Sequence, residues 1–122
     1  MKLYKNFENG SVLESVWNGE IPSGYRELKA GEVDAALEKH VPQIEVKDHT
    51  LKVSVGSIMH PMTPEHYITN IWVEYADGTL ERATLVPEGK PEYVFDTKGR
   101  KGKTVVYEYC NLHGLWKNEI EL

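Results

Sequence analysis

From residue 43 onward the chain is a series of short strand-like segments, and this pattern constrains the fold more than any other feature. The segments cover residues 43–47, 51–55, 68–75, 79–86, 91–96, 103–109 and 118–122. The first two alternate polar and apolar residues, as strands with one buried face do. Strands this short, separated by turn residues, predict an all-β protein built as an antiparallel β-sandwich.

Turn residues between these segments predict how the strands connect. Asp48-His49 separates the first two strands as a two-residue hairpin turn, and Asp77-Gly78 is typical of a type I′ hairpin turn. A third turn, residues 98–103, holds Lys98, Arg100, Lys101 and Lys103. We interpret this basic turn as a solvated hairpin tip, with local attraction of a small anion as the alternative.

The sequence before residue 43 is less regular. Residues 32–40 contain helix formers, and Val41-Pro42 ends that stretch because a residue before proline avoids the helical region. We therefore expect a helical turn before residue 40. Residues 1–30 hold turn pairs such as Asn9-Gly10 and Asn18-Gly19 between short apolar runs. These features predict an N-terminal extension, residues 1–30, followed by a sandwich domain, residues 31–122.

Composition excludes several classes of protein. A chain of 122 residues is one domain by the usual prior, and a formal net charge of −5 disfavours a nucleic-acid binder. No apolar run approaches the roughly 18 residues that span a membrane, and the N-terminus lacks the apolar stretch of a signal peptide. A single cysteine favours a reducing compartment, so we expect a cytoplasmic protein.

That single cysteine stands in the segment Cys110-Asn111-Leu112-His113-Gly114, which brings a thiolate and an imidazole to one turn. Upstream lie His40, His60 and His66. Each of these histidines taken alone is more simply a hydrogen-bonded loop residue, and a lone cysteine is more often a core residue. Together they form a candidate metal site. His49, at a predicted hairpin tip, is not expected to take part.

The number of candidate ligands limits the type of site. Thiolate and imidazole suit iron, zinc and copper. A structural zinc site takes four ligands and usually more than one cysteine. Five protein ligands leave one position open on an octahedral metal, where a small molecule could react.

Three segments of the sequence resemble the signature blocks of the superoxide reductases, the desulfoferrodoxin and neelaredoxin family. They are Glu38-Lys39-His40-Val41-Pro42, the stretch from His60-Pro61-Met62 to Glu65-His66-Tyr67-Ile68, and Cys110-Asn111-Leu112-His113-Gly114. They occur in the family's order and at similar separations, and the resemblance covers roughly residues 31–117.

The resemblance implies an immunoglobulin-like β-sandwich with one mononuclear non-haem iron per chain. Its equatorial ligands would be His40, His60, His66 and His113, and its axial ligand the Cys110 thiolate. The iron would reduce superoxide to hydrogen peroxide and would be re-reduced by an external donor such as rubredoxin. The family also forms symmetric homo-oligomers, so a dimer or tetramer is expected.

Two charged residues beside His40 also take roles from the resemblance. Glu38 would be the carboxylate that occupies the sixth position of ferric iron after turnover. Lys39 would attract superoxide and support protonation of the peroxide. Without the resemblance, each is more simply a solvated charge.

Residues 1–30 resemble a remnant of the rubredoxin-like domain that two-iron members of the family carry. That domain opens with an aromatic residue, a basic residue and Cys-x-x-Cys-Gly. The chain has Tyr4-Lys5-Asn6-Phe7-Glu8-Asn9-Gly10, with asparagines where the cysteines would stand. Amide groups cannot replace four thiolates, so only one metal per chain is expected. An unrelated extension is the alternative.

Two other functions remain open. A copper electron-transfer protein of the cupredoxin type is also a β-sandwich with a Cys-x-x-His segment, but it needs an axial methionine soon after that histidine. Leu115-Trp116-Lys117-Asn118 follows here instead. A structural sandwich with a zinc-stabilised loop is the second alternative.

Overall fold

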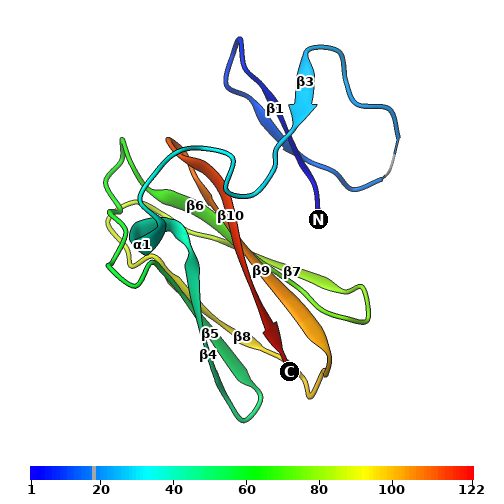
Figure 1. Ribbon diagram of the computed structural model, residues 1–122, viewed down its shortest axis with the longest axis vertical. Coiled ribbons are helices and arrows are strands. Elements are labelled where there is room, and N and C mark those ends of the chain that lie inside the picture. Colours follow the sequence, from blue (N-terminus) through cyan, green and yellow to red (C-terminus); the bar gives the residue numbers. More distant parts are fainter. Residues whose placement is uncertain (18) are drawn as a thin grey trace.

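Two antiparallel sheets face each other and enclose the main hydrophobic core, as the computed structural model shows (Figure 1). One sheet has the strand order β10-β9-β6-β7 and the other β4-β5-β8. Their bounds are β4 Pro42–Lys47, β5 Thr50–Val55, β6 Ile68–Glu74, β7 Leu80–Thr84, β8 Glu92–Asp96, β9 Lys103–Cys110 and β10 Gly114–Glu121. The structure describes residues 1–17 and 19–122. The predicted β-sandwich is confirmed.

Alternation along the strands decides which residues form the core. In β5, Leu51, Val53 and Val55 are at most 1% exposed, and they pack against Ile71, Val73 and Val106 of the facing sheet. The residues between these core positions point outward, because successive side chains of a strand point to opposite faces of the sheet. Trp72 and Tyr109 therefore lie on the outer face of the four-stranded sheet, in a second apolar cluster.

The two predicted hairpins are present, but one turn differs from the prediction. Lys47 pairs with Thr50, so Asp48-His49 is the two-residue turn that the sequence indicated. In the β6–β7 hairpin the Gly78 N–H donates to the Tyr75 carbonyl at 3.0 Å, and only Gly78 has a positive φ. A type I′ turn needs positive φ at both central residues, so that turn type was wrong.

The basic segment 98–103 is not a hairpin tip. It connects β8 to β9, which belong to different sheets, so the chain crosses the sandwich here. Arg100 forms ion pairs with Asp77 and Glu81, which neutralise part of its charge. The segment also lies at the opposite end of β9 from Cys110, about 25 Å away for eight residues of strand. At that distance the solvent screens the charges of the basic segment, so they do not attract a small anion toward the candidate metal site.

The expected helical turn before residue 40 is present as α1, Leu37–His40. Its one apolar residue, Leu37, packs little, since it is 62% exposed. A helix this short gains little from propensity and depends on the contacts that its ends make. It ends at the predicted place, before Pro42.

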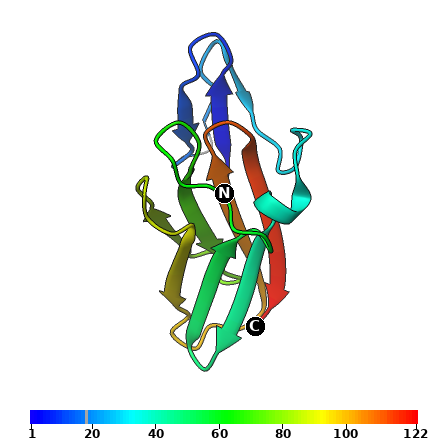
Figure 2. The ribbon, with the colours of Figure 1, turned by 90° about the vertical axis from the view of Figure 1, so that its left-hand side faces the viewer.

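Residues 1–30 form a separate small sheet at one end of the elongated molecule (Figure 2). Its strands are β1 Leu3–Asn6, β2 Val12–Glu14 and β3 Tyr25–Glu27, with β1 in the centre. Leu3 and Leu28 pack with Trp72, Tyr109 and Leu115 on the outer face of the sandwich. The predicted turn at Asn18-Gly19 includes Asn18, which lies outside the described residues. Within residues 1–17 and 19–122, no helix has the length and apolar character needed to cross a membrane.

Candidate metal centre

Five side chains from four parts of the chain meet at one end of the sandwich. They are His40 at the end of α1, His60 and His66 in the loop between β5 and β6, Cys110 at the end of β9, and His113 in the turn before β10. One nitrogen or sulfur atom from each lies within 4.8 Å of all the others. The structure thus brings together every residue predicted as a ligand. His49 is not in the cluster.

Backbone hydrogen bonds fix which nitrogen of two histidines is available to a metal. His40 Nδ1 lies 2.8 Å from the Ala36 carbonyl, and His60 Nδ1 lies 2.7 Å from the Pro61 carbonyl. A carbonyl oxygen only accepts, so each Nδ1 carries the proton. Each Nε2 is then unprotonated, so its lone pair is free to bind a metal, and it points at the other candidate ligands.

Distances between the donor atoms suit ligands of a common ion. His40 Nε2 lies 3.0 Å from His113 Nδ1, and Cys110 Sγ lies 3.4 Å from His60 Nε2. Two nitrogens each about 2.1 Å from a metal and at right angles are about 3.0 Å apart. His66 Nε2 is buried and has no hydrogen-bond partner in the described part of the chain. A buried unpaired nitrogen costs stability, and a metal ion would satisfy it.

The environment keeps these imidazoles neutral. Burial is the main cause that lowers the pKa of His40, His60 and His66, and for His60 it lowers the pKa to about 4. Neighbouring histidines add to the effect, because two imidazolium charges at this separation repel. Neutral imidazoles at pH 7 have the lone pairs that metal binding needs.

The turn after β9 shapes the environment of the only cysteine. Burial raises the pKa of the Cys110 thiol, while the backbone N–H groups of Leu112 and His113 donate to its sulfur and oppose that rise. Gly114 follows with a φ of +80°, which allows the chain to reverse into β10. Trp116 holds the same turn, since its indole N–H donates to the His113 carbonyl at 3.0 Å.

The loop that carries His66 is held by a network that the sequence did not reveal. His66 and Thr63 exchange backbone hydrogen bonds of 3.0 and 3.1 Å across Pro64-Glu65. Asn111 ties this loop to the cysteine turn, because its side chain accepts from Tyr67 N–H and donates to the Glu65 carbonyl. The position of Asn111 next to Cys110 was the available signal.

Gly56 is a second residue whose role the sequence did not show. Its φ is +82°, and a Cβ there would lie 2.3 Å from the Ile58 carbonyl oxygen and 2.7 Å from Lys39 Cα. The close approach lets Ile58 N–H donate to the Glu38 carbonyl at 2.9 Å. This contact places α1, and therefore His40, against the loop that carries His60.

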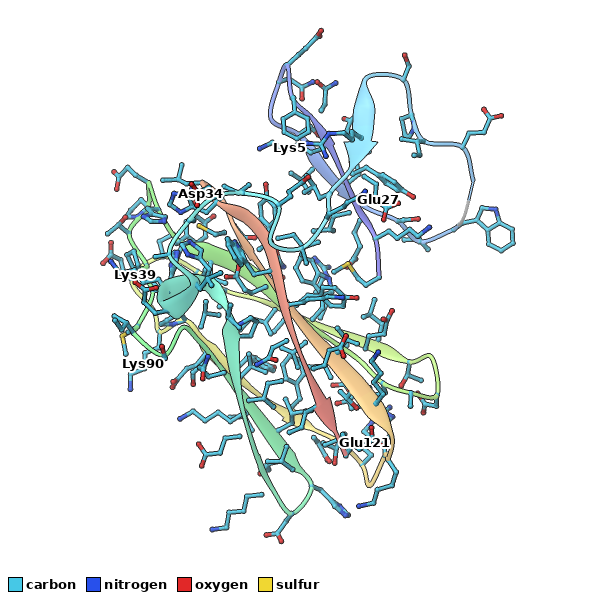
Figure 3. All side chains as sticks on the ribbon, in the orientation of Figure 1. Lys5, Glu27, Asp34, Lys39, Lys90 and Glu121 are labelled. Carbon is cyan, nitrogen blue, oxygen red and sulfur yellow. The ribbon has the colours of Figure 1, made fainter. Side chains whose placement is uncertain are left out.

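Glu38 and Lys39 precede His40 on α1, and both are exposed; Lys39 is labelled in Figure 3. Lys39 is close enough to lower the pKa of His40 and His66 by repulsion, after the larger effect of burial. Among the described residues no hydrogen bond or ion pair joins the Glu38 carboxylate to the cluster, but its charge opposes the lowering of the His40 pKa by burial. The backbone of Glu38 has a defined role, since its carbonyl accepts from Ile58 N–H and from the Ser57 hydroxyl.

An unexpected carboxyl group lies beneath the thiolate. Glu108 is fully buried in β9, and neither of its oxygens has a hydrogen-bond partner among the described residues. Burial raises its pKa well above the ordinary value, so the group is held neutral. Its even spacing from Val106 and Cys110 puts it on the core face of β9, where the sequence pattern favours an apolar residue.

The donor set fits a transition metal and argues against the copper alternative. Four imidazoles and one thiolate suit iron, zinc or copper by ligand type. Blue-copper sites use two histidines, a cysteine and a weak axial methionine. Here Met62 is buried with its sulfur accepting from Ile68 N–H at 3.4 Å, and Met59 is 66% exposed. The cluster therefore has more imidazoles than such a site uses and lacks its methionine.

Comparison with known proteins gives the same assignment as the site. The family model described as desulfoferrodoxin matches residues 32–119. A desulfoferrodoxin of Clostridium acetobutylicum is 48% identical over 96 residues, covering 76% of this chain and 71% of that protein. A desulfoferrodoxin of Nitratidesulfovibrio vulgaris is 40% identical over 124 residues, covering 97% of this chain and 95% of that protein.

Solved structures extend the likeness to the fold. The crystal structure of the superoxide reductase from Treponema pallidum has a TM-score of 0.71 and 37% identity, and the match covers 88% of this chain and 92% of that one. The sandwich is thus the immunoglobulin-like fold that the sequence resemblance implied. The family model matches most of the chain, and the Nitratidesulfovibrio vulgaris desulfoferrodoxin is 40% identical over 97% of it, so the chain belongs to the desulfoferrodoxin family.

Proposed function

We propose that this protein is a superoxide reductase, which converts superoxide to hydrogen peroxide at a mononuclear iron centre. The observation that carries the proposal is the convergence of one cysteine sulfur and four imidazoles, with one ligand atom of each within 4.8 Å of the others. The Treponema pallidum protein described as a superoxide reductase matches this chain over most of both lengths. Iron is the metal we propose, with His40, His60, His66 and His113 as imidazole ligands and Cys110 as the thiolate.

The overall reaction adds one electron and two protons to superoxide and gives hydrogen peroxide. An iron ion held by these five residues would supply that electron and would bind the substrate. The protein prepares and positions the ligand side chains. Burial lowers the pKa of His40, His60 and His66, the Ala36 and Pro61 carbonyls orient His40 and His60, and two backbone N–H groups donate to the Cys110 sulfur.

Lys39 and Glu38 are the residues we propose to act on the substrate side. Lys39 is exposed beside His40, and its cationic amine attracts the superoxide anion. We also assign it a role in supporting protonation of the product. Glu38 is exposed on the same helical turn, and its carboxylate would be a further ligand for the oxidised metal. Local steering by Lys39 predicts that activity falls as ionic strength rises.

Each superoxide reduced consumes one electron, which a donor has to return to the metal centre. We propose a small electron-transfer protein such as rubredoxin as the donor, and a homo-oligomer, dimer or tetramer, as the assembled state.

We further propose that residues 1–30 are the remnant of a rubredoxin-like domain that has lost its metal. Asn6 and Asn9 stand at the separation of a Cys-x-x-Cys pair, and Gly10 follows with a φ of +78°. Both side chains are occupied by backbone hydrogen bonds of the same turn. One metal per chain is therefore expected.

Pulse radiolysis of the iron-loaded, reduced protein tests the activity. Superoxide should disappear with one peroxide formed per superoxide and no dioxygen released, because the electron comes from the protein. Dioxygen and peroxide in equal yield would mean dismutation and would overturn the proposal. Lys39→Ala should slow the reaction at low ionic strength, whereas the distant Lys103→Ala should leave it unchanged.

A further inference from the structure

Trp116 is a buried residue of β10 that contacts two of the candidate metal ligands without being a ligand itself. The centroid of its ring lies 5.1 Å from that of His40, and the two ring planes are tilted by 32°. Its indole N–H donates to the His113 carbonyl at 3.0 Å. His40 and His113 are 73 residues apart in the chain, so Trp116 links two separate segments that carry ligands.

The contact with His40 restrains the plane of that imidazole. A hydrogen bond from His40 Nδ1 to the Ala36 carbonyl, 2.8 Å long, fixes one edge of the ring. One hydrogen bond leaves the ring able to rock about it, and the indole of Trp116 limits this motion, since aromatic rings at this separation attract each other. The two contacts together hold His40 Nε2 toward His113 Nδ1, which lies 3.0 Å away.

The hydrogen bond to the His113 carbonyl restrains a ligand that has no other outer support. Within the described ranges, the ring of His113 is close enough for hydrogen bonds only to two other candidate ligands, His40 and Cys110. A metal-binding histidine usually has an outer partner that orients its ring. The orientation of His113 therefore depends on its backbone, and Trp116 anchors that backbone.

Trp116 is itself held in place by its surroundings. It is only 3% exposed, and it stands opposite Glu108 in the pairing of β9 with β10. Its outer side is covered where the chain approaches α1, which lies beside β10 (Figure 2). There Gly31 N–H donates to the Leu115 carbonyl at 2.8 Å, and a Cβ on Gly31 would lie 4.0 Å from Trp116 Cζ3. A side chain locked by packing can position its neighbours accurately.

We propose that Trp116 is a positioning residue of the metal centre, which holds the imidazoles of His40 and His113 in the arrangement that one metal ion needs. The inference rests on the metal centre proposed above and adds to it a residue that is not a ligand. Outer groups that orient ligands commonly change metal affinity by about 10- to 100-fold. Because Trp116 makes two separate contacts, removing one or both should give graded effects.

Cobalt(II) is the probe, because its ligand-field absorption bands depend on how the ligands are arranged and its thiolate band reports Cys110. The full-length protein is titrated with cobalt(II) in competition with a chelator. Trp116→Phe keeps a ring against His40 and removes the N–H, so affinity should fall about tenfold and the ligand-field bands should shift. Trp116→Leu removes both contacts, and affinity should fall about 100-fold while the thiolate band remains.

Trp72→Phe is the matched control for these variants. Trp72 is also 3% exposed and also donates one hydrogen bond, to Glu14, but it lies in the apolar cluster on the outer face of the sandwich. The control should lose about as much unfolding free energy in urea as Trp116→Phe does. Its cobalt affinity should change by less than about twofold, because outer-shell effects need contact with a ligand, and its bands should not shift.

Three results would overturn the inference. They are an unchanged affinity and spectrum in Trp116→Leu, equal losses in Trp116→Phe and Trp116→Leu, and the same band shift in Trp72→Phe. The last would show that general stability, not contact with the ligands, supports the site. A parent protein that binds no cobalt would contradict the proposed metal centre itself. If Trp116→Leu does not fold, the comparison of Trp116→Phe with Trp72→Phe still decides the outcome.

Discussion

Two turns of this protein have similar hydrogen bonds at their first residue and differ in what that residue faces. In the first, Asn6 Oδ1 accepts from the N–H groups of Glu8 and Asn9, at 2.9 and 3.3 Å. In the second, Cys110 Sγ accepts from Leu112 and His113, the residues two and three positions on. The glycine that closes each turn has nearly the same φ, +78° at Gly10 and +80° at Gly114.

The difference shows that such a turn can position one metal ligand but does not make a metal site by itself. The amide of Asn6 is satisfied by its own turn, and Asn9 likewise accepts from Ser11 N–H at 2.9 Å. Cys110 instead faces four imidazoles that other segments bring to it. A metal centre therefore needs donor atoms from several segments, and the buried loops around Cys110 supply them.

The largest expected effect is on the metal, when the thiolate is removed. Cys110→Ser replaces a soft thiolate by a neutral hydroxyl, and we expect metal affinity to fall more than about 100-fold, because even outer-shell changes cost 10–100-fold. Equilibrium dialysis against a competing chelator measures the loss. Asn6→Ser in the matching turn should leave the affinity unchanged, and a loss there would contradict the comparison.

The next effect tests whether the converging segments must be held together. Gly56→Ala forces a positive φ on alanine and drives its Cβ against backbone atoms of Ile58 and Lys39. We expect a loss of about 3 kcal/mol of unfolding free energy, seen in urea denaturation, together with weaker metal binding. Gly78→Ala is the control, because a Cβ there meets nothing within 4 Å and only the strain of about 1–2 kcal/mol remains.

A third test concerns the strands that lead into the two turns. Two residues before Cys110 stands the buried Glu108, and two residues before Asn6 stands Tyr4. The pKa of Glu108 is higher in the folded protein than in the unfolded chain, so its contribution favours folding at low pH and is lost as pH rises above about 4.5.

Glu108→Gln removes this titration and keeps the shape of the side chain. The unfolding free energy of the parent protein should fall with rising pH, by up to about 1.4 kcal/mol per pH unit, and the variant should lack this slope. Chemical denaturation at several pH values, with both proteins in the same metal state, measures the difference. Parallel slopes for the two proteins would show that Glu108 is not held neutral.

The smallest effect is expected in the first turn. Asn6→Ala removes two hydrogen bonds at an exposed site, which should cost about 1 kcal/mol locally. Hydrogen exchange should show faster exchange of the Glu8 and Asn9 amides, while the Leu112 and His113 amides stay protected. Faster exchange in both turns would indicate that the N-terminal sheet supports the metal centre, contrary to the separation described here.

Local patterns in the sequence were sufficient for the strands and for the residues of the cluster. Alternation located β4 and β5: one face of β5 is buried, whereas in β4 only Pro42 is buried and Ile44 partly buried. The prolines around His60 and His66 indicated an ordered loop. The five donors were found because thiolate and imidazole suit one kind of metal. Their meeting at one end of the sandwich confirms the grouping.

The structural features that could not be predicted from the sequence depend on contacts between segments that are far apart in the chain. The crossover at 98–103 follows from which sheet β8 joins, and β8 pairs with β5 rather than with β9. The closeness of Gly56 to Lys39 and the burial of Glu108 also arise only when sheets and loops pack.

Metal analysis of the purified protein tests the central claim most directly. Elemental mass spectrometry together with protein quantification should find one iron per chain, and none of it should be lost in Asn6→Ser. Stoichiometric copper or zinc in place of iron, or two metal ions per chain, would contradict the account.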